Sequence, residues 1–219
     1  MIIRAPPEAR RKDKRKMNVE ELKREIIAAG HQAYVSGMVS AAGGNISMRL
    51  GGRYFITATN APLRSLKPED IVEVDIEGNI VGDDYGKRPS KEVCLHLAVF
   101  RSRPDIDSVI HVHPVFSIAC SIAMPGQFPI LTVSAEQKIG KVAYVPYSKP
   151  GSAELVNSAN KALAESDESV KTIIMERHGI IVYDIGMEKC YERTELVEES
   201  AKVGIYSSLT KAALAQLEK

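Results

Sequence analysis

The sequence contains few cysteines and no long apolar segment. Its three cysteines, Cys94, Cys120 and Cys190, lie far apart and form no CxxC pair, which indicates buried free thiols in a reducing compartment and argues against a disulfide framework. The longest apolar stretches, such as residues 117–123, are too short to span a bilayer. No N-terminal segment has the basic, apolar and small-residue order of a signal peptide. We therefore expect a cytoplasmic protein with no membrane partner.

The net charge of +1 is also small, but it is unevenly distributed along the chain. Residues 1–16 carry seven basic and two acidic side chains, a net charge of +5, which leaves −4 on residues 17–219. A mildly acidic body is not typical of a nucleic-acid-binding surface. We interpret residues 1–16 as a basic, disordered tail and residues 17–219 as one folded domain. The alternative is that the basic run at 10–16 binds phosphates or an anionic membrane.

A chain of 219 residues that is 44% hydrophobic suits one domain of moderate size. Helical spacing and capping signals predict helices over residues 18–35, 89–103, 152–165 and 187–217, the last with a break near Gly204. Short apolar runs between turn residues predict strands over 41–49, 53–57, 71–75, 79–81, 108–113, 130–133, 142–145, 172–176 and 180–183. Several connections are hairpins, so the sheet should be mixed and largely antiparallel. Helices on both faces would give an α/β fold, a three-layer α/β/α sandwich.

Two of the five histidines form the sequence His111-Val112-His113 at the end of a predicted strand. Residues i and i+2 of a strand point to the same face, so both imidazoles can reach one ion while Val112 faces the core. Such a pair alone is as typical of two structural histidines as of a metal site.

His178 strengthens the metal interpretation. It stands in a predicted tight turn before Gly179, between two apolar strands. Three histidines at strand ends suit catalytic zinc, which has three protein ligands and an open position. Manganese, cobalt or iron remain alternatives, because imidazole binds several divalent metals. His31 is interpreted as structural, and for His96 a hydrogen bond within its helix to Glu92 is favoured over a second metal site.

Three further segments carry groups that suit an anion. A Gly-Gly-Asn turn offers bare backbone amides, a Thr-Asn pair adds donors, and a Ser-Lys pair stands where the second helix should begin, at its positive dipole end. Glu92 follows that pair, and beside a metal it would serve as a ligand or a general base. The candidate phosphate-binding residues are Gly44, Asn45, Thr59, Asn60, Ser90 and Lys91.

Six segments occur in an order and spacing that resemble the class II aldolase/adducin family over residues 18–205. They are AAGGNIS (41–47), FITATNAPLRSLKPEDIVEVD (55–75), RPSKEVCLH (88–96), IHVHP (110–114), VPYSKPGS (145–152) and ERHGIIV (176–182). Within the family, the resemblance is greatest to aldolases that act on ketose 1-phosphates of the L-fuculose 1-phosphate type. It implies a three-layer α/β/α fold and a homotetramer with active sites at subunit boundaries.

The resemblance also implies a chemistry for the candidate residues. His111, His113 and His178 would hold one Zn²⁺ per chain, and Glu92 would complete the metal shell and then act as acid and base. The six phosphate-site candidates would surround the substrate phosphate. The chain would then be a metal-dependent aldehyde-lyase of carbohydrate metabolism. It would cleave or form a ketose 1-phosphate, with dihydroxyacetone phosphate and a small aldehyde such as lactaldehyde as the other reactants.

Some positions depart from the family pattern. Lys91 stands where a second small hydroxyl residue is frequent, and Asn60 stands where glycine is usual. The segment 130–134 has no tyrosine, so the proton donor to the aldehyde oxygen is unassigned, with Tyr206 as one candidate. The alternatives are a pentulose-phosphate 4-epimerase or a methylthioribulose-phosphate dehydratase of the same family. A non-catalytic, adducin-like module is disfavoured, because it should have lost metal ligands.

Deletion of residues 1–16 should leave the melting temperature and the turnover rate unchanged, because this segment has too few apolar groups to pack against a core. Thermal unfolding and steady-state kinetics of the truncated chain check this prediction. A large fall in either quantity would contradict it. Binding of the full chain to duplex DNA at physiological salt would instead support the nucleic-acid interpretation.

Overall fold

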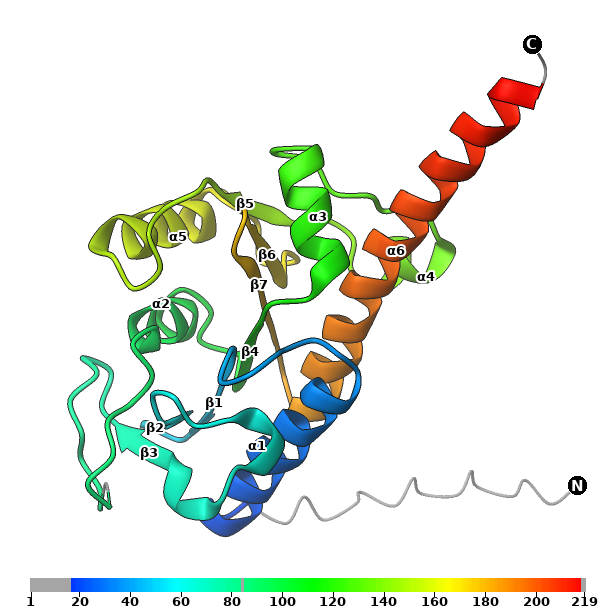
Figure 1. Cartoon of the computed structure of the whole chain (residues 1–219). Coiled ribbons are helices and arrows are strands. Elements are labelled where there is room, and N and C mark those ends of the chain that lie inside the picture. The colour runs from blue at the N-terminus through cyan, green and yellow to red at the C-terminus, as the bar shows by residue number, and fades with distance from the viewer. Residues whose placement is uncertain (1–16, 84, 218–219) are drawn as a thin grey trace, which may run out of the picture.

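The computed structural model describes residues 17–83 and 85–217 (Figure 1), so the predictions for residues 1–16 lie outside the described residues. The helices are α1 (Val19–Val35), α2 (Val93–Ser102), α3 (Val115–Ala123), α4 (Val133–Lys138), α5 (Ala153–Glu165) and α6 (Met187–Leu217). The strands are β1 (Asn45–Leu50), β2 (Arg53–Thr57), β3 (Ile71–Val74), β4 (Ser108–Val112), β5 (Ala143–Val145), β6 (Thr172–Met175) and β7 (Gly179–Asp184). None of the helices in these ranges is long and apolar enough to cross a membrane.

The strands form one mixed sheet in the order β3-β2-β1-β4-β7-β6-β5. Every neighbouring pair is antiparallel except β5 and β6, which are parallel. Helices α2 and α5 pack together on one face, and α1, α3 and α4 pack with α6 on the other (Figure 1). The predicted three-layer α/β/α sandwich is therefore confirmed.

The central strand of this sheet is β4, which is buried along its whole length. Its neighbours β1 and β7 run antiparallel to it. His111 of β4 pairs with Asn45 of β1 on one side and with Ile181 of β7 on the other. The last residues of β4 therefore lie beside the first residues of β1 and β7. This edge of the sheet is where the chain can bring together side chains from distant parts of the sequence.

The predicted strand over residues 130–133 is wrong, because Thr132 caps helix α4 instead. The Thr132 hydroxyl accepts a hydrogen bond from the backbone N–H of Ala135 at 3.1 Å. A short apolar run does not distinguish a strand from a helix start by periodicity. The predicted strand over residues 79–81 is reduced to one isolated bridge between Ile80 and Val74.

Helix α3 is absent from the sequence-based prediction, and its N-terminus explains why. The backbone N–H groups of Phe116 and Ser117 donate to the carboxylate of Glu198 at 3.0 and 2.9 Å. Glu198 belongs to α6, so the group that satisfies these amides is distant in the sequence. Helix α6 runs through Gly204 without the predicted break, and a β-carbon at Gly204 would lie 2.5 Å from the ring of Pro129.

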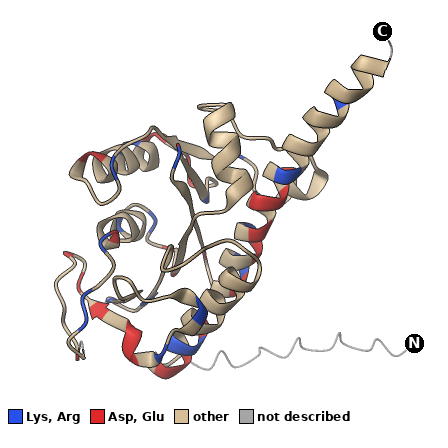
Figure 2. Ribbon diagram, viewed as in Figure 1, with Lys and Arg blue, Asp and Glu red and all other residues tan. Residues whose placement is uncertain are grey.

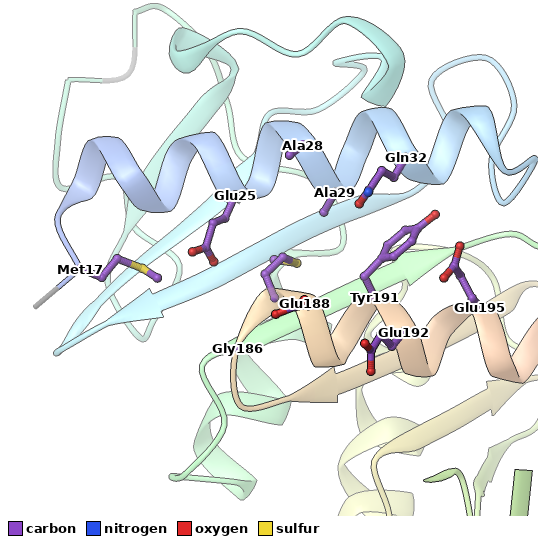
Figure 3. Close-up of a pocket in the computed structure, with 11 residues that line it drawn as sticks. Met17, Glu25, Ala28, Ala29, Gln32, Gly186, Glu188, Tyr191, Glu192 and Glu195 are labelled. Carbon is purple, nitrogen blue, oxygen red and sulfur yellow. The ribbon is translucent and has the colours of Figure 1, made fainter. Parts of the chain in front are cut away.

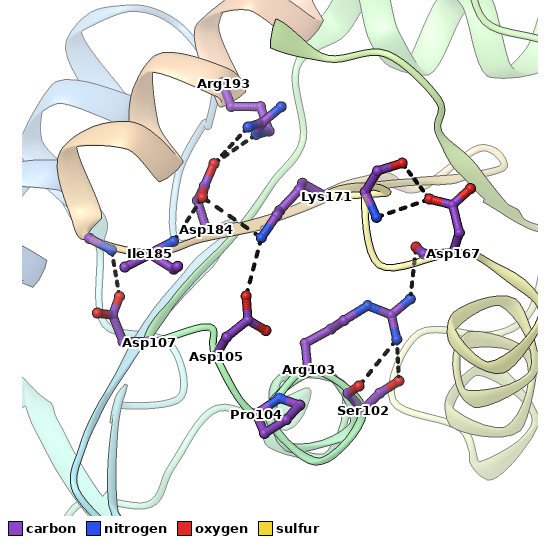
Figure 4. A network of polar contacts seen from close by, with 12 residues as sticks. Ser102, Arg103, Pro104, Asp105, Asp107, Asp167, Lys171, Asp184, Ile185 and Arg193 are labelled. Atoms are coloured by element: carbon purple, nitrogen blue, oxygen red, sulfur yellow. Dashed lines mark hydrogen bonds and ion pairs between the residues drawn. The ribbon is translucent and has the colours of Figure 1, made fainter.

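A buried arginine ties the two helices of one face to each other. Arg103 follows α2 and is 6% exposed, yet its guanidinium donates to the carbonyl of Leu163 and to the hydroxyl of Ser166, both at 3.0 Å. Figure 4 shows Arg103 between Ser102 and the segment of Asp167, separate from a second group in which Arg193 donates to Asp184 at 2.7 Å. Arg103 thus satisfies polar groups at the end of α5, among them the buried carbonyl of Leu163.

In the variant Arg103→Met the free energy of unfolding should be about 2–3 kcal/mol lower than in the parent chain, because buried acceptors are left without a charged donor. Arg101→Met is the matched control: Arg101 lies on the exposed side of α2 and donates to the carbonyl of Ile76, so its loss should cost less than about 1 kcal/mol. Urea unfolding at one fixed protein concentration measures both values. Equal losses in the two variants would contradict the role given to Arg103.

Candidate active site and metal centre

Four side chains converge where β4 ends: Glu92, His111, His113 and His178. Each offers one ligand atom, and these atoms lie within 4.8 Å of one another. His111 and His113 come from the end of β4, His178 from the turn between β6 and β7, and Glu92 from the residue before α2. The structure therefore brings together the three histidines and the glutamate that the sequence singled out.

The distances within this group fit a divalent metal. Nε2 of His111 lies 3.1 Å from Oε2 of Glu92 and 3.0 Å from Nε2 of His113, and Nε2 of His178 lies 3.3 Å from Oε1 of Glu92. Zinc bonds of about 2.0–2.1 Å in a tetrahedral arrangement separate neighbouring ligands by roughly 3.3 Å. Small adjustments would place all four ligands around one ion.

The hydrogen bonding of His111 shows why a cation belongs here. Its Nδ1 lies 2.9 Å from the carbonyl oxygen of Ile180 on β7. A carbonyl oxygen accepts only, so Nδ1 carries a proton, and Nε2, which faces the Glu92 carboxylate, is the nitrogen left to bind a metal. Nε2 and the carboxylate would repel each other at this distance without a positive charge at the contact, which is either a second ring proton or a metal ion in its place. Fixing the tautomer of a histidine ligand in this way is typical of protein metal sites.

A buried atom without a partner supports the same conclusion. Oε1 of Glu92 is buried and makes no hydrogen bond with the described residues, although His178 lies nearby. Leaving a carboxylate oxygen buried and unpaired costs free energy, and coordination to a metal would remove that cost. Imidazole nitrogens and a carboxylate are the donor set that zinc and related ions prefer.

The protonation states of the group also suit a metal. Burial alone would raise the pKa of Glu92, but a positive charge on His111 and the close contacts with His111, His178 and Asn45 together hold its pKa well below the usual value. Burial, followed by the charges of His111 and His178, lowers the pKa of His113 to about 3. An ionised carboxylate and a neutral imidazole are the forms in which these side chains bind metal ions.

Two glycines make room for His113. A β-carbon at Gly43 would lie 2.9 Å from Nδ1 of that ring. A β-carbon at Gly179 would lie 2.8 Å from its Cδ2 and 2.4 Å from the carbonyl oxygen of Val112. Real β-carbons do not come as close to backbone atoms as 2.4 Å, so glycine is required at position 179, and a β-carbon at position 43 would displace the ring of His113.

The candidate phosphate-binding residues line the same cleft as the metal group. This cleft has a volume of about 470 Å³ and includes Glu92, His113 and His178 in its wall. It also includes all six candidates that the sequence indicated: Gly44, Asn45, Thr59, Asn60, Ser90 and Lys91. Polar donors and a candidate metal centre therefore face one space.

Helix α2 begins at Val93, so the prediction that it begins at Pro89 is wrong. Residues before a proline favour extended backbone, and Pro89 forms an isolated bridge with Ala58 while the N–H of Ser90 donates to the carbonyl of Thr57 at 3.1 Å. The segment thus extends the pairing of β2. As a consequence Glu92 occupies the N-cap position, where its side chain turns toward the histidines and makes no cap hydrogen bond.

Asn60, which stands where the family usually has glycine, adopts a left-handed backbone with φ of 61°. Asparagine tolerates this region far better than most residues with a β-carbon. The turn is therefore retained, and the exposed amide of Asn60 is added to the cleft.

Arg177 is a cleft residue that sequence analysis did not select. It lines the cleft beside His178, its backbone has φ of 59°, and its guanidinium lies 4.7 Å from the ring centroid of Tyr147. The sequence offers only a weak signal that Arg177 lies in the cleft, namely its position next to a turn histidine. Its contact with Tyr147 depends on the packing of two loops that are distant in the sequence.

His96 also departs from its prediction. It makes no helix-internal hydrogen bond to Glu92; its two ring nitrogens contact Ser47 and Asn45 of β1. The ring is 1% exposed, and burial, then the charge of His111, lowers the pKa of His96 to about 3. His96 is therefore a neutral, buried group behind the cleft.

A larger groove of about 580 Å³ lies between α1 and α6, away from the histidines. Figure 3 shows Glu25 of α1 facing Glu188 and Tyr191 of α6, and Glu192 and Glu195 complete its acidic lining. Burial, followed by the charges of Asp107, Glu21 and Glu188, raises the pKa of Glu25. Figure 2 shows acidic residues along α6, the helix that forms one wall of this groove. Such a surface repels a phosphate, so the smaller cleft is the better candidate for an anionic substrate.

Comparison with known proteins identifies the family. Residues 24–205 match the model of the class II aldolase and adducin N-terminal domain. The chain belongs to this family. The L-fuculose-1-phosphate aldolase of Thermus thermophilus has a similar structure, with a TM-score of 0.76, 25% identity, and coverage of 88% of this chain and 96% of that one.

Curated relatives span more than one reaction. The L-fuculose phosphate aldolase of Methanocaldococcus jannaschii is 32% identical over 189 residues, which cover 86% of this chain and 98% of that protein. A 5-methylthioribulose-1-phosphate/5-deoxyribulose-1-phosphate aldolase of Escherichia coli is 33% identical, covering 77% and 76%. A 3-oxo-tetronate 4-phosphate decarboxylase of Haemophilus influenzae is 29% identical, covering 81% and 84%. The expectation of an enzyme of the class II aldolase family is confirmed, and its substrate is a separate question.

Purified protein should hold about one zinc ion per chain, because three histidine ligands with one open position are typical of a catalytic zinc site. His111→Ala and His178→Ala should each abolish both metal binding and activity. Elemental analysis by mass spectrometry measures the metal content. His31→Ala is the matched control, because His31 lies on the exposed side of α1. Full metal occupancy in the double variant His111→Ala/His113→Ala would exclude this assignment.

Proposed function

We propose that the protein is a zinc-dependent aldolase that cleaves or forms a ketose 1-phosphate of the L-fuculose 1-phosphate type. The products of cleavage would be dihydroxyacetone phosphate and a small aldehyde such as lactaldehyde. One observation carries the proposal: Glu92, His113 and His178, which group with the buried His111, line the same cleft as the six candidate anion-binding residues. Curated relatives named aldolases of ketose 1-phosphates support the choice of substrate class.

The phosphate would bind on the side of the cleft formed by the turn before β1, the segment after β2 and the segment before α2. Gly44, with φ of 77°, exposes its backbone toward the cleft, and Asn45 and Thr59 add polar side chains. Lys91 is exposed there and supplies a full positive charge. Backbone amides and one lysine can bind a phosphate without a preformed arginine fork.

The three histidines would hold the ion, which when bound polarises a substrate carbonyl and stabilises the negative charge that develops beside it. Glu92 lies within 3.3 Å of two of these histidines and is ionised, so it is placed to take a proton from the carbon next to that carbonyl. The same carboxyl can return the proton in the cleavage direction.

The quaternary structure and the location remain predictions. Tyr206 on α6 does not line the cleft of its own chain, and it is 58% exposed. Leu209, Leu214 and Leu217 further along α6 are also exposed. These apolar side chains support the proposed homotetramer, in which a neighbouring copy would cover them. A role for Tyr206 as the proton donor to the aldehyde oxygen would then require that it reach the cleft of another subunit.

Glu92→Gln should slow the chemical step by about 10²- to 10⁴-fold while substrate binding persists, because the amide keeps the shape of the carboxyl and loses its basicity. The readout is exchange of the C3 hydrogen of dihydroxyacetone phosphate with deuterated water, followed by NMR without aldehyde. Glu77→Gln is the control, since Glu77 is exposed in a hairpin turn.

The same assay separates the proposal from its rivals. Absence of exchange by the parent protein, together with interconversion of two pentulose phosphates, would replace the aldolase with an epimerase. Release of carbon dioxide from a 3-oxo-tetronate 4-phosphate would favour a decarboxylase, the activity in the name of one relative. Absence of all these reactions with zinc fully bound would favour a dehydratase or a non-catalytic role.

A further inference from the structure

Behind Glu92 lies a chain of three buried polar side chains. The hydroxyl of Ser47 is 2.6 Å from Nδ1 of His96, and Nε2 of His96 is 2.5 Å from Oδ1 of Asn45. Nδ2 of Asn45 donates to Oε2 of Glu92 at 3.0 Å. Ser47, His96 and Asn45 are 2%, 1% and 6% exposed, so water does not compete for these hydrogen bonds.

The chemistry of the groups permits one direction for every proton in this chain. An ionised carboxylate only accepts, so the amide NH₂ of Asn45 must face Glu92 and its Oδ1 must face His96. Oδ1 also accepts only, so Nε2 of His96 carries the ring proton. Nδ1 of the neutral ring is then an acceptor, and the Ser47 hydroxyl must donate to it.

We propose that His96 is a positioning residue that acts on Glu92 through the amide of Asn45. By donating from Nε2, His96 fixes the orientation of an amide that would otherwise be free to turn over. A reversed amide would set Oδ1 of Asn45 against Oε2 of Glu92, and two acceptors in contact repel each other. The relay therefore holds Oε2 in place and leaves Oε1, which has no hydrogen-bond partner among the described residues, available to accept a proton.

The position of the relay in the sheet gives it a rigid base. Ser47 and Asn45 are two residues apart on β1, so both side chains point to the same face, toward α2. Asn45 is also the backbone partner of His111 across β1 and β4. Asn45 thus has two roles. Its backbone pairing sets the register of β1 with β4, which positions His111, and its side chain orients the proposed base, Glu92. The kinetic consequence of the relay rests on the proposed function; the direction of its hydrogen bonds does not.

The first test reads the hydrogen-bond direction without any activity measurement. In protein labelled with ¹⁵N at histidine, His96 should show a protonated Nε2 and an unprotonated Nδ1, both before and after zinc is added. His96→Gln removes the signal and assigns it, and the exposed His31 serves as the internal reference for a solvated ring. A proton on Nδ1, or on both nitrogens, would overturn the proposed relay.

The second test uses two variants that each keep half of the His96 contacts. A glutamine amide can occupy the place of Nε2 and still donate to Asn45, whereas the shorter asparagine reaches only the place of Nδ1 and can bond to Ser47 alone. His96→Asn should lower kcat by about 10- to 100-fold. His96→Gln should recover most of that loss, with zinc content near one per chain in both variants.

The comparison distinguishes positioning from a general loss of structure. A merely structural role predicts that both variants lose stability and activity in parallel, with no recovery by glutamine, and that result would overturn the proposal. Parent-like C3 exchange in His96→Asn at full zinc occupancy would overturn it as well. If the parent protein itself catalyses no exchange, the proposed function fails, and the ¹⁵N measurement still decides whether the relay exists.

Discussion

The structure of the site depends on one constraint, the convergence of four candidate metal-ligating side chains around a contact that requires a positive charge. The hydrogen bond from Nδ1 of His111 to the carbonyl of Ile180 leaves Nε2 facing the Glu92 carboxylate at 3.1 Å. A positive charge must lie between these two atoms for the arrangement to be stable, either as a second ring proton or as a metal ion that takes its place. Because His111 is fully buried on the central strand, it cannot turn away to relieve the repulsion.

The strand order of the sheet brings these side chains together. Placing β4 between β1 and β7 sets the end of one strand against the beginnings of two others. His178 precedes β7, Asn45 begins β1, and Glu92 approaches from the N-terminus of α2 on the same side. Glu198 of α6 then anchors α3 directly after His113 through two backbone N–H groups. Both helical layers therefore support the group, and loss of either support would change its geometry.

Local patterns were sufficient to predict much of this arrangement. The alternation of His111 and His113 on a strand, and the turn histidine before Gly179, predict side chains at strand ends from nearest-neighbour geometry alone. Other features depend on contacts between residues far apart in the sequence. The N-terminus of helix α3 is capped by Glu198, which is 82 positions after Phe116 and 81 after Ser117. Pro89 is held in an extended conformation by its pairing with Ala58. The contacts of His96 with β1 depend on how α2 packs against the sheet. The helical spacing of residues in the sequence does not determine that packing.

The most direct measurement of the central claim is X-ray absorption at the zinc edge of the purified, zinc-loaded protein. The account predicts a first shell of three imidazole nitrogens and carboxylate oxygen at about 2.0–2.2 Å, with the multiple scattering of histidine rings. In Glu92→Gln the three-imidazole contribution should persist while the carboxylate contribution is lost. A shell that contains sulfur, or one of oxygens without imidazole scattering, would contradict the account.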